Sequence, residues 1–264
     1  MIAPALLMPE IVALAEAAGA EIMRHYGSEV AVGHKADSSP VTIADGAAEA
    51  VILAGLRKVT PSIPIVAEEA VAAGHVPEVG DGPFWLVDPL DGTREFISKN
   101  GEFTVNIALI ESRRPILGVV FAPAAGPGEA GDGAGGTMWW GALGHGSTRR
   151  DAEGARAIAV RRRPAEGAVA VASRSHRDQA TDAWLAARGI GETVAAGSSL
   201  KFCLVAEGRA DVYPRFGPTM EWDVAAGHAV LAAAGGRVTD LDGAPFTYLK
   251  PDFRNAGFIA WGRD

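Results

Sequence analysis

Two segments near the start of the chain carry apolar residues at helical spacing. The apolar positions are Ile11, Leu14, Ala15, Ala18, Ile22 and Tyr26 in the first segment and Ala44, Ala47, Val51, Leu56 and Val59 in the second. Residues three and four positions apart share one face of an α-helix, so both segments predict amphipathic helices that pack on a sheet. Similar spacing predicts further helices over 178–188, 200–207 and 223–234.

Short apolar runs between these helices predict strands. The runs cover 63–67, 84–87, 103–110, 116–121, 168–172, 210–213, 237–239 and 258–260. A polar turn at Arg113 and Arg114 separates the third run from the fourth, which predicts an antiparallel hairpin and a sheet that is antiparallel or mixed. Residues 123–136 are rich in glycine, alanine and proline and lack the GKS or GKT ending of a P-loop, which predicts a flexible surface loop.

The size and charge of the chain narrow the classes of protein it can belong to. Its 264 residues suffice for one large or two modest domains with a sizeable core. Its 32 acidic and 24 basic residues give a net charge of −8, which argues against a nucleic-acid-binding surface. This balance suits a protein that gathers acids around cations.

The single cysteine and the distribution of apolar residues bear on the compartment. Cys203 has no partner for an internal disulfide and has apolar neighbours, so we expect a reducing, cytoplasmic compartment and a buried thiol rather than a nucleophile. No apolar run approaches the roughly 18 residues of a membrane span, and no basic, apolar leader opens the sequence. Peripheral attachment to the inner membrane face stays open, as does a homodimer.

Two carboxylates follow an apolar strand in the run from Trp85 to Thr93. Asp88 and Asp91 lie three residues apart, and Gly92 follows them. Mg²⁺ prefers hard oxygen ligands and keeps several waters, so carboxylates on an open turn suit it. Gly92 lets the backbone approach a phosphate, and a helix starting there would direct free N–H groups at the anion. An ordinary turn is the alternative, because Asp-Pro and Asp-Gly pairs are common turn formers.

Further acids lie at the ends of apolar runs elsewhere in the chain. Glu68 and Glu69 close the run 63–67, and Asp223 follows Trp222 at the start of an apolar stretch. Together with Asp88 and Asp91, these acids favour a metal site over a simple turn. Taken in isolation, Asp223 is an N-cap candidate.

These motifs resemble those of the inositol monophosphatase-like superfamily of Mg²⁺-dependent, lithium-sensitive phosphatases. The W-x-x-D-P-x-D-G-T run spans Trp85–Thr93, and the W-D-x-A-A-G run spans Trp222–Gly227. The resemblance covers almost the whole chain. The strings GTREFISKNGEFTVNIALIE, SRSH, GSSLKFCLVAEG and YPRFGPT are more similar to bacterial 3′(2′),5′-bisphosphate nucleotidases than to simple inositol monophosphatases.

The resemblance implies an α+β fold, a layered αβαβα sandwich. It implies an N-terminal α+β subdomain over 1–155 that carries most metal ligands, and a C-terminal α/β subdomain over 156–264 that carries Asp223 and the nucleotide-side residues. The positions that match metal ligands in the superfamily are Glu68, Asp88, the carbonyl of Leu90, Asp91 and Asp223. Two Mg²⁺ ions are implied, with a third possible near Glu68, and Glu69 is placed outside the ligand set. Such crowded carboxylates need cations to offset their repulsion.

The resemblance also implies a mechanism. A water whose pKa the cations lower is oriented by the Thr93 hydroxyl, which hydrogen-bonds Asp45, and this pair takes its proton. The phosphate rests on the metals and on the N–H groups of Gly92 and Thr93, while Asp223 assists departure of the ribose oxygen. The alternative for Asp45 is an acid that complements the dipole of its own helix.

Substrate contacts are carried over from the nucleotidase-like strings. His176, Ser198, Lys201 and Arg215 are candidates for the nucleotide and its 5′-phosphate, since cationic and hydroxyl groups suit a second phosphate. The alternatives are ordinary surface charge for Lys201 and Arg215 and a loop histidine for His176. The complete substrate-facing set is Glu68, Asp91, Gly92, Thr93, His176, Ser198, Lys201, Arg215 and Asp223.

The expected activity is therefore hydrolysis of the 3′-phosphate of adenosine 3′,5′-bisphosphate to AMP and phosphate, in sulfur assimilation or nucleotide recycling. Two alternatives stay open. A phosphatase of this superfamily can act on inositol monophosphate or fructose 1,6-bisphosphate, because metal motifs report the chemistry while the pocket selects the leaving group. A non-catalytic regulatory protein is the other alternative, and the complete set of acids argues against it.

Overall fold

The computed structural model describes residues 3–27, 32–34, 40–126, 135–173 and 178–264. Within this part of the chain, the strands form one seven-stranded sheet, one five-stranded sheet and two two-stranded ribbons. The helices are α1 (Pro4–Tyr26), α2 (Ile43–Val59), α3 (Glu68–Ala72), α4 (Thr93–Ile97), α5 (Gln179–Ala186), α6 (Leu200–Ala206), α7 (Glu221–Ala233) and a 3₁₀ turn (Pro251–Phe253). None of these helices is long and apolar enough to cross a membrane.

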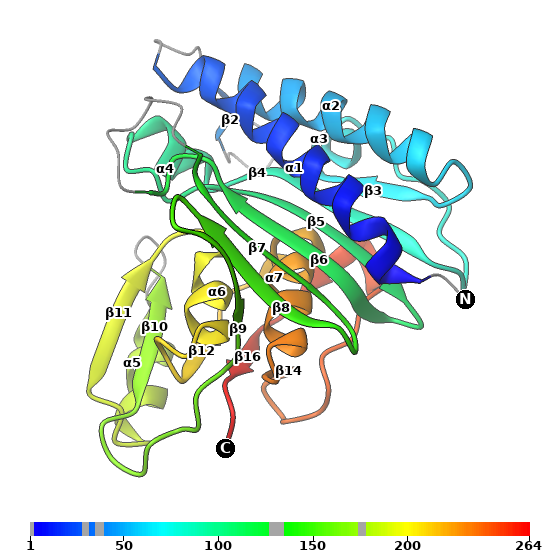
Figure 1. Cartoon of the computed structure of the whole chain (residues 1–264). Coiled ribbons are helices and arrows are strands. Elements are labelled where there is room, and N and C mark those ends of the chain that lie inside the picture. The colour runs from blue at the N-terminus through cyan, green and yellow to red at the C-terminus, as the bar shows by residue number, and fades with distance from the viewer. Residues whose placement is uncertain (1–2, 28–31, 35–39, 127–134, 174–177) are drawn as a thin grey trace.

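The seven-stranded sheet is mixed and follows chain order. Its strands are β3 (Ile65–Ala67), β4 (Phe84–Asp91), β5 (Thr104–Glu111), β6 (Arg114–Ala122), β7 (Thr137–Ala142), β8 (Gly146–Asp151) and β9 (Gly154–Ile158). Only β3 and β4 run parallel, and each later neighbouring pair is antiparallel, including the predicted β5–β6 hairpin. In Figure 1, α1 and α2 (blue) cover the outer face of this sheet.

The five-stranded sheet has the order β11-β10-β12-β16-β14. Its strands are β10 (Val169–Ser173), β11 (Glu192–Ala196), β12 (Val212–Arg215), β14 (Arg237–Thr239) and β16 (Phe258–Trp261). The ribbons pair β1 (Val32–His34) with β2 (Pro40–Thr42), and β13 (Thr219–Met220) with β15 (Arg254–Asn255). Helix α5 packs against this sheet. Its buried Leu185 belongs to the same hydrophobic cluster as Ala170 of β10 and Val212 of β12.

Helices α6 and α7 lie between the two sheets (Figure 1). Helix α7 is buried on nearly every side, as expected for a helix that packs against a sheet on each side. Gly118 of β6 allows this close packing, because a Cβ there would lie 2.6 Å from the carbonyl oxygen of Ala226. The layers therefore run helix, sheet, helix, sheet, helix, which confirms the αβαβα sandwich.

The helices predicted from apolar spacing are confirmed, and so are the predicted strands, with ends shifted by a few residues. Strands β7, β8, β9 and β11 and the short strands of the two ribbons were not predicted. The sequences of β8 and β9 are polar because most of their residues are exposed or half-buried, in β9 at the edge of the sheet and in β8 next to it. The division between residues 155 and 156 stays a prediction, and it falls inside β9. Most of the predicted surface loop, residues 127–134, lies outside the described residues.

One buried titratable group in the middle layer predicts a pH dependence of stability. His228 of α7 is buried with its Nδ1 2.9 Å from the Tyr248 hydroxyl, and burial lowers its pKa to about 3. Below the unfolded pKa near 6.5 this histidine gains a proton only in the unfolded chain, so the contribution of His228 to stability falls as the pH falls. Between pH 7 and pH 5 this costs about 2 kcal/mol, a loss that His228→Gln should remove.

Urea unfolding at both pH values measures this difference. His145→Gln is the control, because His145 is exposed on the turn between β7 and β8. An equal loss of stability in wild type and His228→Gln would show that His228 does not carry the effect.

Candidate metal centre

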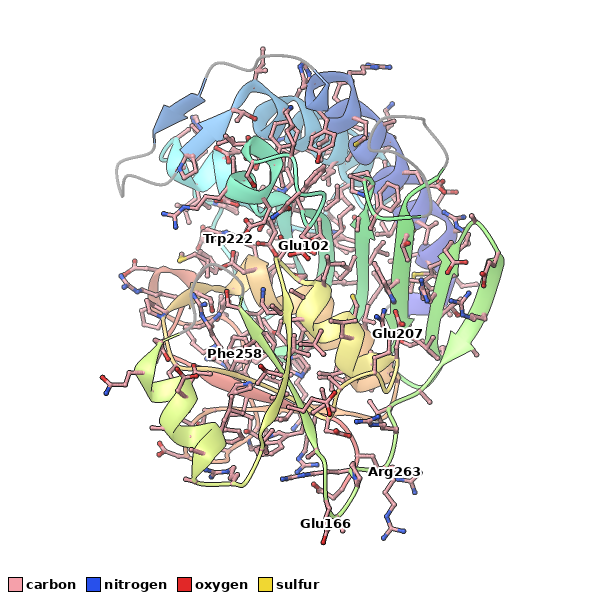
Figure 2. The ribbon with its side chains drawn as sticks, turned by 90° about the vertical axis from the view of Figure 1, so that its left-hand side faces the viewer. Glu102, Glu166, Glu207, Trp222, Phe258 and Arg263 are labelled. Atoms are coloured by element: carbon pink, nitrogen blue, oxygen red, sulfur yellow. The ribbon has the colours of Figure 1, made fainter. Side chains whose placement is uncertain are left out.

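One cavity of about 290 Å³ is lined by five acidic residues, of which four, from three elements, are the predicted metal-site acids. Glu68 begins α3, Asp88 and Asp91 lie at the end of β4, and Asp223 lies in the first turn of α7. Figure 2 labels Trp222, which precedes Asp223, at the level where the seven-stranded sheet meets the middle helices. Leu90, whose carbonyl group is the fifth predicted metal ligand, also lines the cavity. The structure thus brings all five predicted ligand positions together.

The end of β4 departs from regular pairing at its two acids. The register with β5 shifts between Asp88 and Asp91, where Pro89 has no N–H to give to a ladder. Asp88 Oδ1 accepts the N–H of Leu90 at 3.0 Å, which fixes the turn. Gly92 follows with φ +92°, a conformation that favours glycine, and the short helix α4 begins at the next residue.

The start of α3 is held by an acid from another helix. Glu49 of α2 is buried and accepts the N–H groups of Glu69 at 2.8 Å and of Ala70 at 2.9 Å. These first-turn N–H groups have no partner within the helix, so Glu49 serves as their cap. This contact fixes the helix that places Glu68 in the cavity.

Burial and mutual repulsion raise the pKa values of the acids. The pKa of Asp88 is well above its usual range, first through burial and then through the charges of Glu68, Asp91 and Asp223. Burial also raises the pKa of Asp91 to about 6 and that of Asp223 well above its usual range. Carboxyl groups arranged in this way favour a compensating positive charge.

Each of the three aspartates is held through one oxygen. Asp223 Oδ2 accepts the N–H of Met220 at 2.8 Å, and Asp91 Oδ2 accepts from Ser199 Oγ at 3.2 Å and Asn106 Nδ2 at 3.4 Å. Asp88 uses Oδ1 for the N–H of Leu90. The other carboxylate oxygen of Asp91 and of Asp223 is left for a ligand, and hard oxygen donors of this kind fit Mg²⁺.

A hydrogen bond between the side chains of Asp88 and Glu68 further raises the pKa of Asp88. Among the described residues, no three acidic, His or Cys side chains stand in a preformed metal-binding arrangement. Asp223 is the third residue of α7 and Met220 its N-cap, so the N-cap alternative for Asp223 is wrong.

Thr93 and Asp45 are hydrogen-bonded as expected. The Thr93 hydroxyl donates to Asp45 Oδ1 at 3.2 Å, and it is 3.4 Å from the carbonyl oxygen of Leu90. Asp45 Oδ2 accepts both the N–H and the hydroxyl of Thr42 at 2.7 Å, which completes a capping box at the start of α2. Asp45 is therefore also an N-terminal helix acid, and the two interpretations of it are compatible. Thr93 lines the cavity while Asp45 lies behind it.

Three of the four nucleotide-side candidates, Ser198, Lys201 and Arg215, line the same cavity. Lys201 is only 6% exposed, so the surface-charge alternative is wrong for it. Burial lowers the pKa of Lys201 to about 8, although the charge of Asp91 opposes this shift. Arg215 has a buried Nε without a hydrogen-bond partner among the described residues. His176 lies outside the described residues.

Several residues around the cavity were missed by sequence reasoning. Glu95, Ser173 and Tyr213 line the cavity, while Ser199 and Asn106 hold Asp91 from outside it. Asn106 interrupts the apolar run of β5, and this polar residue was an available signal. The position of Ser199 carried no such signal, because its contact with Asp91 depends on the tertiary fold.

Comparison with known proteins agrees with this geometry. A sequence model of the inositol monophosphatase family matches residues 7–260. The chain is 47% identical over 255 residues to the 3′(2′),5′-bisphosphate nucleotidase CysQ of Escherichia coli O157:H7, covering 96% of this chain and 98% of the relative. It is 40% identical to the nucleotidase CysQ of Buchnera aphidicola, covering 96% and 93%.

Solved structures give the same result. The crystal structure of CysQ from Bacteroides thetaiotaomicron, described as a bacterial member of the inositol monophosphatase family, superposes with a TM-score of 0.79 at 34% identity, covering 99% of this chain and 98% of that one. Inositol monophosphatase from Anabaena superposes with a TM-score of 0.73 at 28% identity, covering 95% and 88%. On the sequence match, the fold and the shared architecture, the chain belongs to the inositol monophosphatase family.

Proposed function

We propose that this protein is a Mg²⁺-dependent 3′(2′),5′-bisphosphate nucleotidase that converts adenosine 3′,5′-bisphosphate to AMP and phosphate. The observation that carries the proposal is a single cavity that is lined by the four predicted metal-site acids and also by Lys201 and Arg215. The acids suit cations and the two basic residues suit a second phosphate. Relatives 40–47% identical to the chain are named as nucleotidases of this kind, and the family consists of metal-dependent phosphatases.

The ligand set that we propose for two Mg²⁺ ions comprises Glu68, Asp88, the carbonyl of Leu90, Asp91 and Asp223, with Glu68 also available to a third ion. Bound cations supply a lowered pKa for a water and stabilise charge on the transferred phosphoryl group. Asp91 and Asp223 are each held by hydrogen bonds to one carboxylate oxygen, which supports this assignment because the other oxygen stays in place for an ion.

The chain's own groups then perform the remaining steps. Thr93, fixed by Asp45, accepts a hydrogen bond from the attacking water and passes its proton toward the Asp45 carboxylate. The N–H groups of Gly92 and Thr93, at the start of α4, face the phosphate. Asp223 lies on the side of the departing ribose oxygen. Catalysis in this account consists of positioning and charge stabilisation, without a covalent intermediate.

The nucleotide side predicts a split in substrate preference. Lys201→Ala removes a buried ammonium that we assign to the 5′-phosphate, while the metal ligands stay in place. The KM for adenosine 3′,5′-bisphosphate should rise about 10-fold or more, the cost of a lost charged hydrogen bond, and the KM for inositol 1-phosphate should rise less. Steady-state kinetics on both substrates measures the difference. Equal increases in KM for the two substrates would show that Lys201 does not bind the 5′-phosphate.

A substrate panel tests the proposed function. Purified protein freed of metal with EDTA is assayed for phosphate release from adenosine 3′,5′-bisphosphate, inositol 1-phosphate and fructose 1,6-bisphosphate, with and without added Mg²⁺. The highest kcat/KM is expected for the nucleotide, only with Mg²⁺. A higher kcat/KM for inositol 1-phosphate or fructose 1,6-bisphosphate would show that this compound, and not the nucleotide, is the preferred substrate. If none of the three compounds releases phosphate in a Mg²⁺-dependent way, the result would support a regulatory binding protein.

A further inference from the structure

The turn Gly197–Ser199 contributes Gly197 and Ser198 to the lining of the cavity and is held by several hydrogen bonds. The N–H of Gly197 donates to Glu102 Oε2 at 2.8 Å. The Ser198 hydroxyl lies 2.8 Å from the carbonyl oxygen of Asp91 and 2.7 Å from that of Glu102. Ser198 has φ +47°, a conformation that costs a residue with a Cβ free energy. Figure 2 labels Glu102 at this junction of the layers.

This anchored turn directs the Ser199 hydroxyl to two metal-site residues from different parts of the fold. Ser199 Oγ lies 3.2 Å from Asp91 Oδ2, at the end of β4, and 2.9 Å from the carbonyl oxygen of Asp223, in α7. Ser199 is only 1% exposed, so no solvent competes for its proton. A hydroxyl has one proton to donate, and an ionised carboxylate is the stronger acceptor.

The contact restricts which oxygen of Asp91 is available. The hydrogen bonds that described residues make to the Asp91 side chain, from Ser199 and Asn106, both end on Oδ2. Oδ1 is therefore the oxygen presented to the cavity.

We propose that Ser199 is a positioning residue for the metal centre, which fixes the Asp91 carboxylate relative to Asp223 and so sets the affinity for divalent cations. The inference rests on the proposed function, because it needs Asp91 to be a metal ligand. Partners that hydrogen-bond metal ligands from outside typically contribute 10–100-fold to metal affinity. Ser199→Ala should therefore weaken Mg²⁺ binding by about 10-fold or more.

Isothermal titration of Mg²⁺ into EDTA-treated protein measures this effect without reference to activity. Ser147→Ala is the matched control: Ser147 of β8 is also buried and donates to a carbonyl of α7, that of Val230, at 2.7 Å, away from the cavity. Both variants lose one buried serine hydroxyl that lies within hydrogen-bond distance of a carbonyl oxygen of α7. Only Ser199→Ala should lose Mg²⁺ affinity, while Ser147→Ala should bind as the wild type does.

A second variant separates the loss of the hydrogen bond from the effect of the small void that Ser199→Ala leaves. Ser199→Cys keeps the size of the side chain but offers a weak donor, so its Mg²⁺ affinity should fall by a similar factor. Wild-type affinity in Ser199→Ala or in Ser199→Cys would overturn the role of Ser199 and leave the metal site intact. Equal weakening in Ser147→Ala would also overturn it, by showing a general loss of stability. Absence of Mg²⁺ binding in the wild type would overturn the inference together with the proposed function.

Discussion

Replacing Asp88 with asparagine is expected to abolish most phosphate release while making the metal-free protein more resistant to unfolding. Asp88 is buried at the centre of the acid cluster, and its folded pKa exceeds its unfolded value. A carboxyl group whose pKa is raised by folding destabilises the folded state at neutral pH, and an amide removes that cost. Activity should fall by at least about 10²–10³-fold, as for loss of one preorganised charge-stabilising group.

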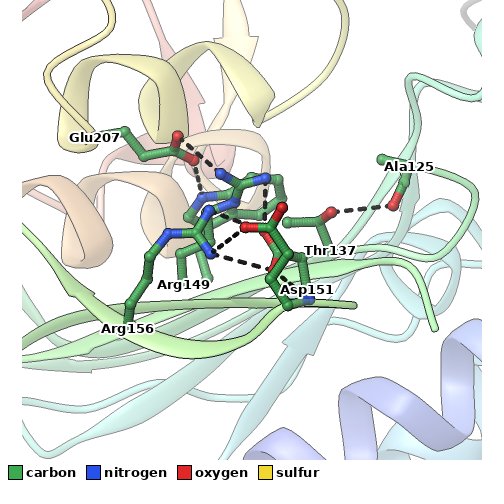
Figure 3. Close-up of polar contacts among 8 residues, drawn as sticks. Ala125, Thr137, Arg149, Asp151, Arg156 and Glu207 are labelled. Atoms are coloured by element: carbon green, nitrogen blue, oxygen red, sulfur yellow. Dashed lines mark hydrogen bonds and ion pairs between the residues drawn. The ribbon is translucent and has the colours of Figure 1, made fainter. Parts of the chain in front are cut away.

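Denaturant unfolding in EDTA and the Mg²⁺-dependent assay measure the two effects. Asp151→Asn is the control, for which the expected change in stability has the opposite sign. Asp151 of β8 is ion-paired with Arg149 and Arg156 (Figure 3), and the hydrogen bond from Arg156 lowers its pKa. Removing its charge should reduce stability slightly and leave activity unchanged. Lower metal-free stability of Asp88→Asn would contradict the proposed repulsion among the acids.

Replacing Thr93 with alanine is expected to lower kcat by about 10²–10⁴-fold, the usual contribution of positioned proton transfer, while Mg²⁺ affinity changes little. The Thr93 hydroxyl lies between the cavity and Asp45, at 3.2 Å from Asp45 Oδ1. Asp45→Ala should have a similar effect on kcat. It should also destabilise the protein by about 0.5–2 kcal/mol, because it removes the capping box of α2.

Thr93→Ser keeps the hydroxyl and should retain most of the activity, which separates the loss of the group from a disturbance of the turn. Steady-state kinetics and Mg²⁺ titration together distinguish the proton relay from metal binding. Unchanged kcat in Thr93→Ala would exclude the relay. A parallel loss of Mg²⁺ affinity would instead place Thr93 in the metal shell.

Sequence reasoning located the parts of the fold whose pattern is local. The amphipathic helices and the apolar first half of β4 were predicted because burial on one face or both faces leaves a periodic or continuous apolar run. Edge strands such as β9 and β11 were missed, because exposed residues at a sheet edge carry no such pattern. The order of the layers came from the family resemblance rather than from periodicity.

The candidate site was predictable to the extent that its chemistry is written in short motifs. Glu68, Asp88, Asp91 and Asp223 were identified as acids at the ends of apolar runs and then matched to the family. Their supporting contacts were not, because Ser199 and Asp91 are 108 positions apart and meet only through tertiary packing. The burial of Lys201 was hidden for the same reason: a lysine near the start of a helix is usually solvated.

The central claim is that carboxylates from distant segments hold divalent cations. A crystal structure of the protein soaked with Mn²⁺ and AMP, with anomalous scattering recorded for the metal, tests it most directly. The account predicts metal peaks about 2.1 Å from oxygens of Asp88 and its neighbours in the cavity, with the phosphate of AMP toward Lys201 and Arg215. Metal peaks elsewhere, with this cavity empty in an enzyme that is active with the same metal, would contradict it.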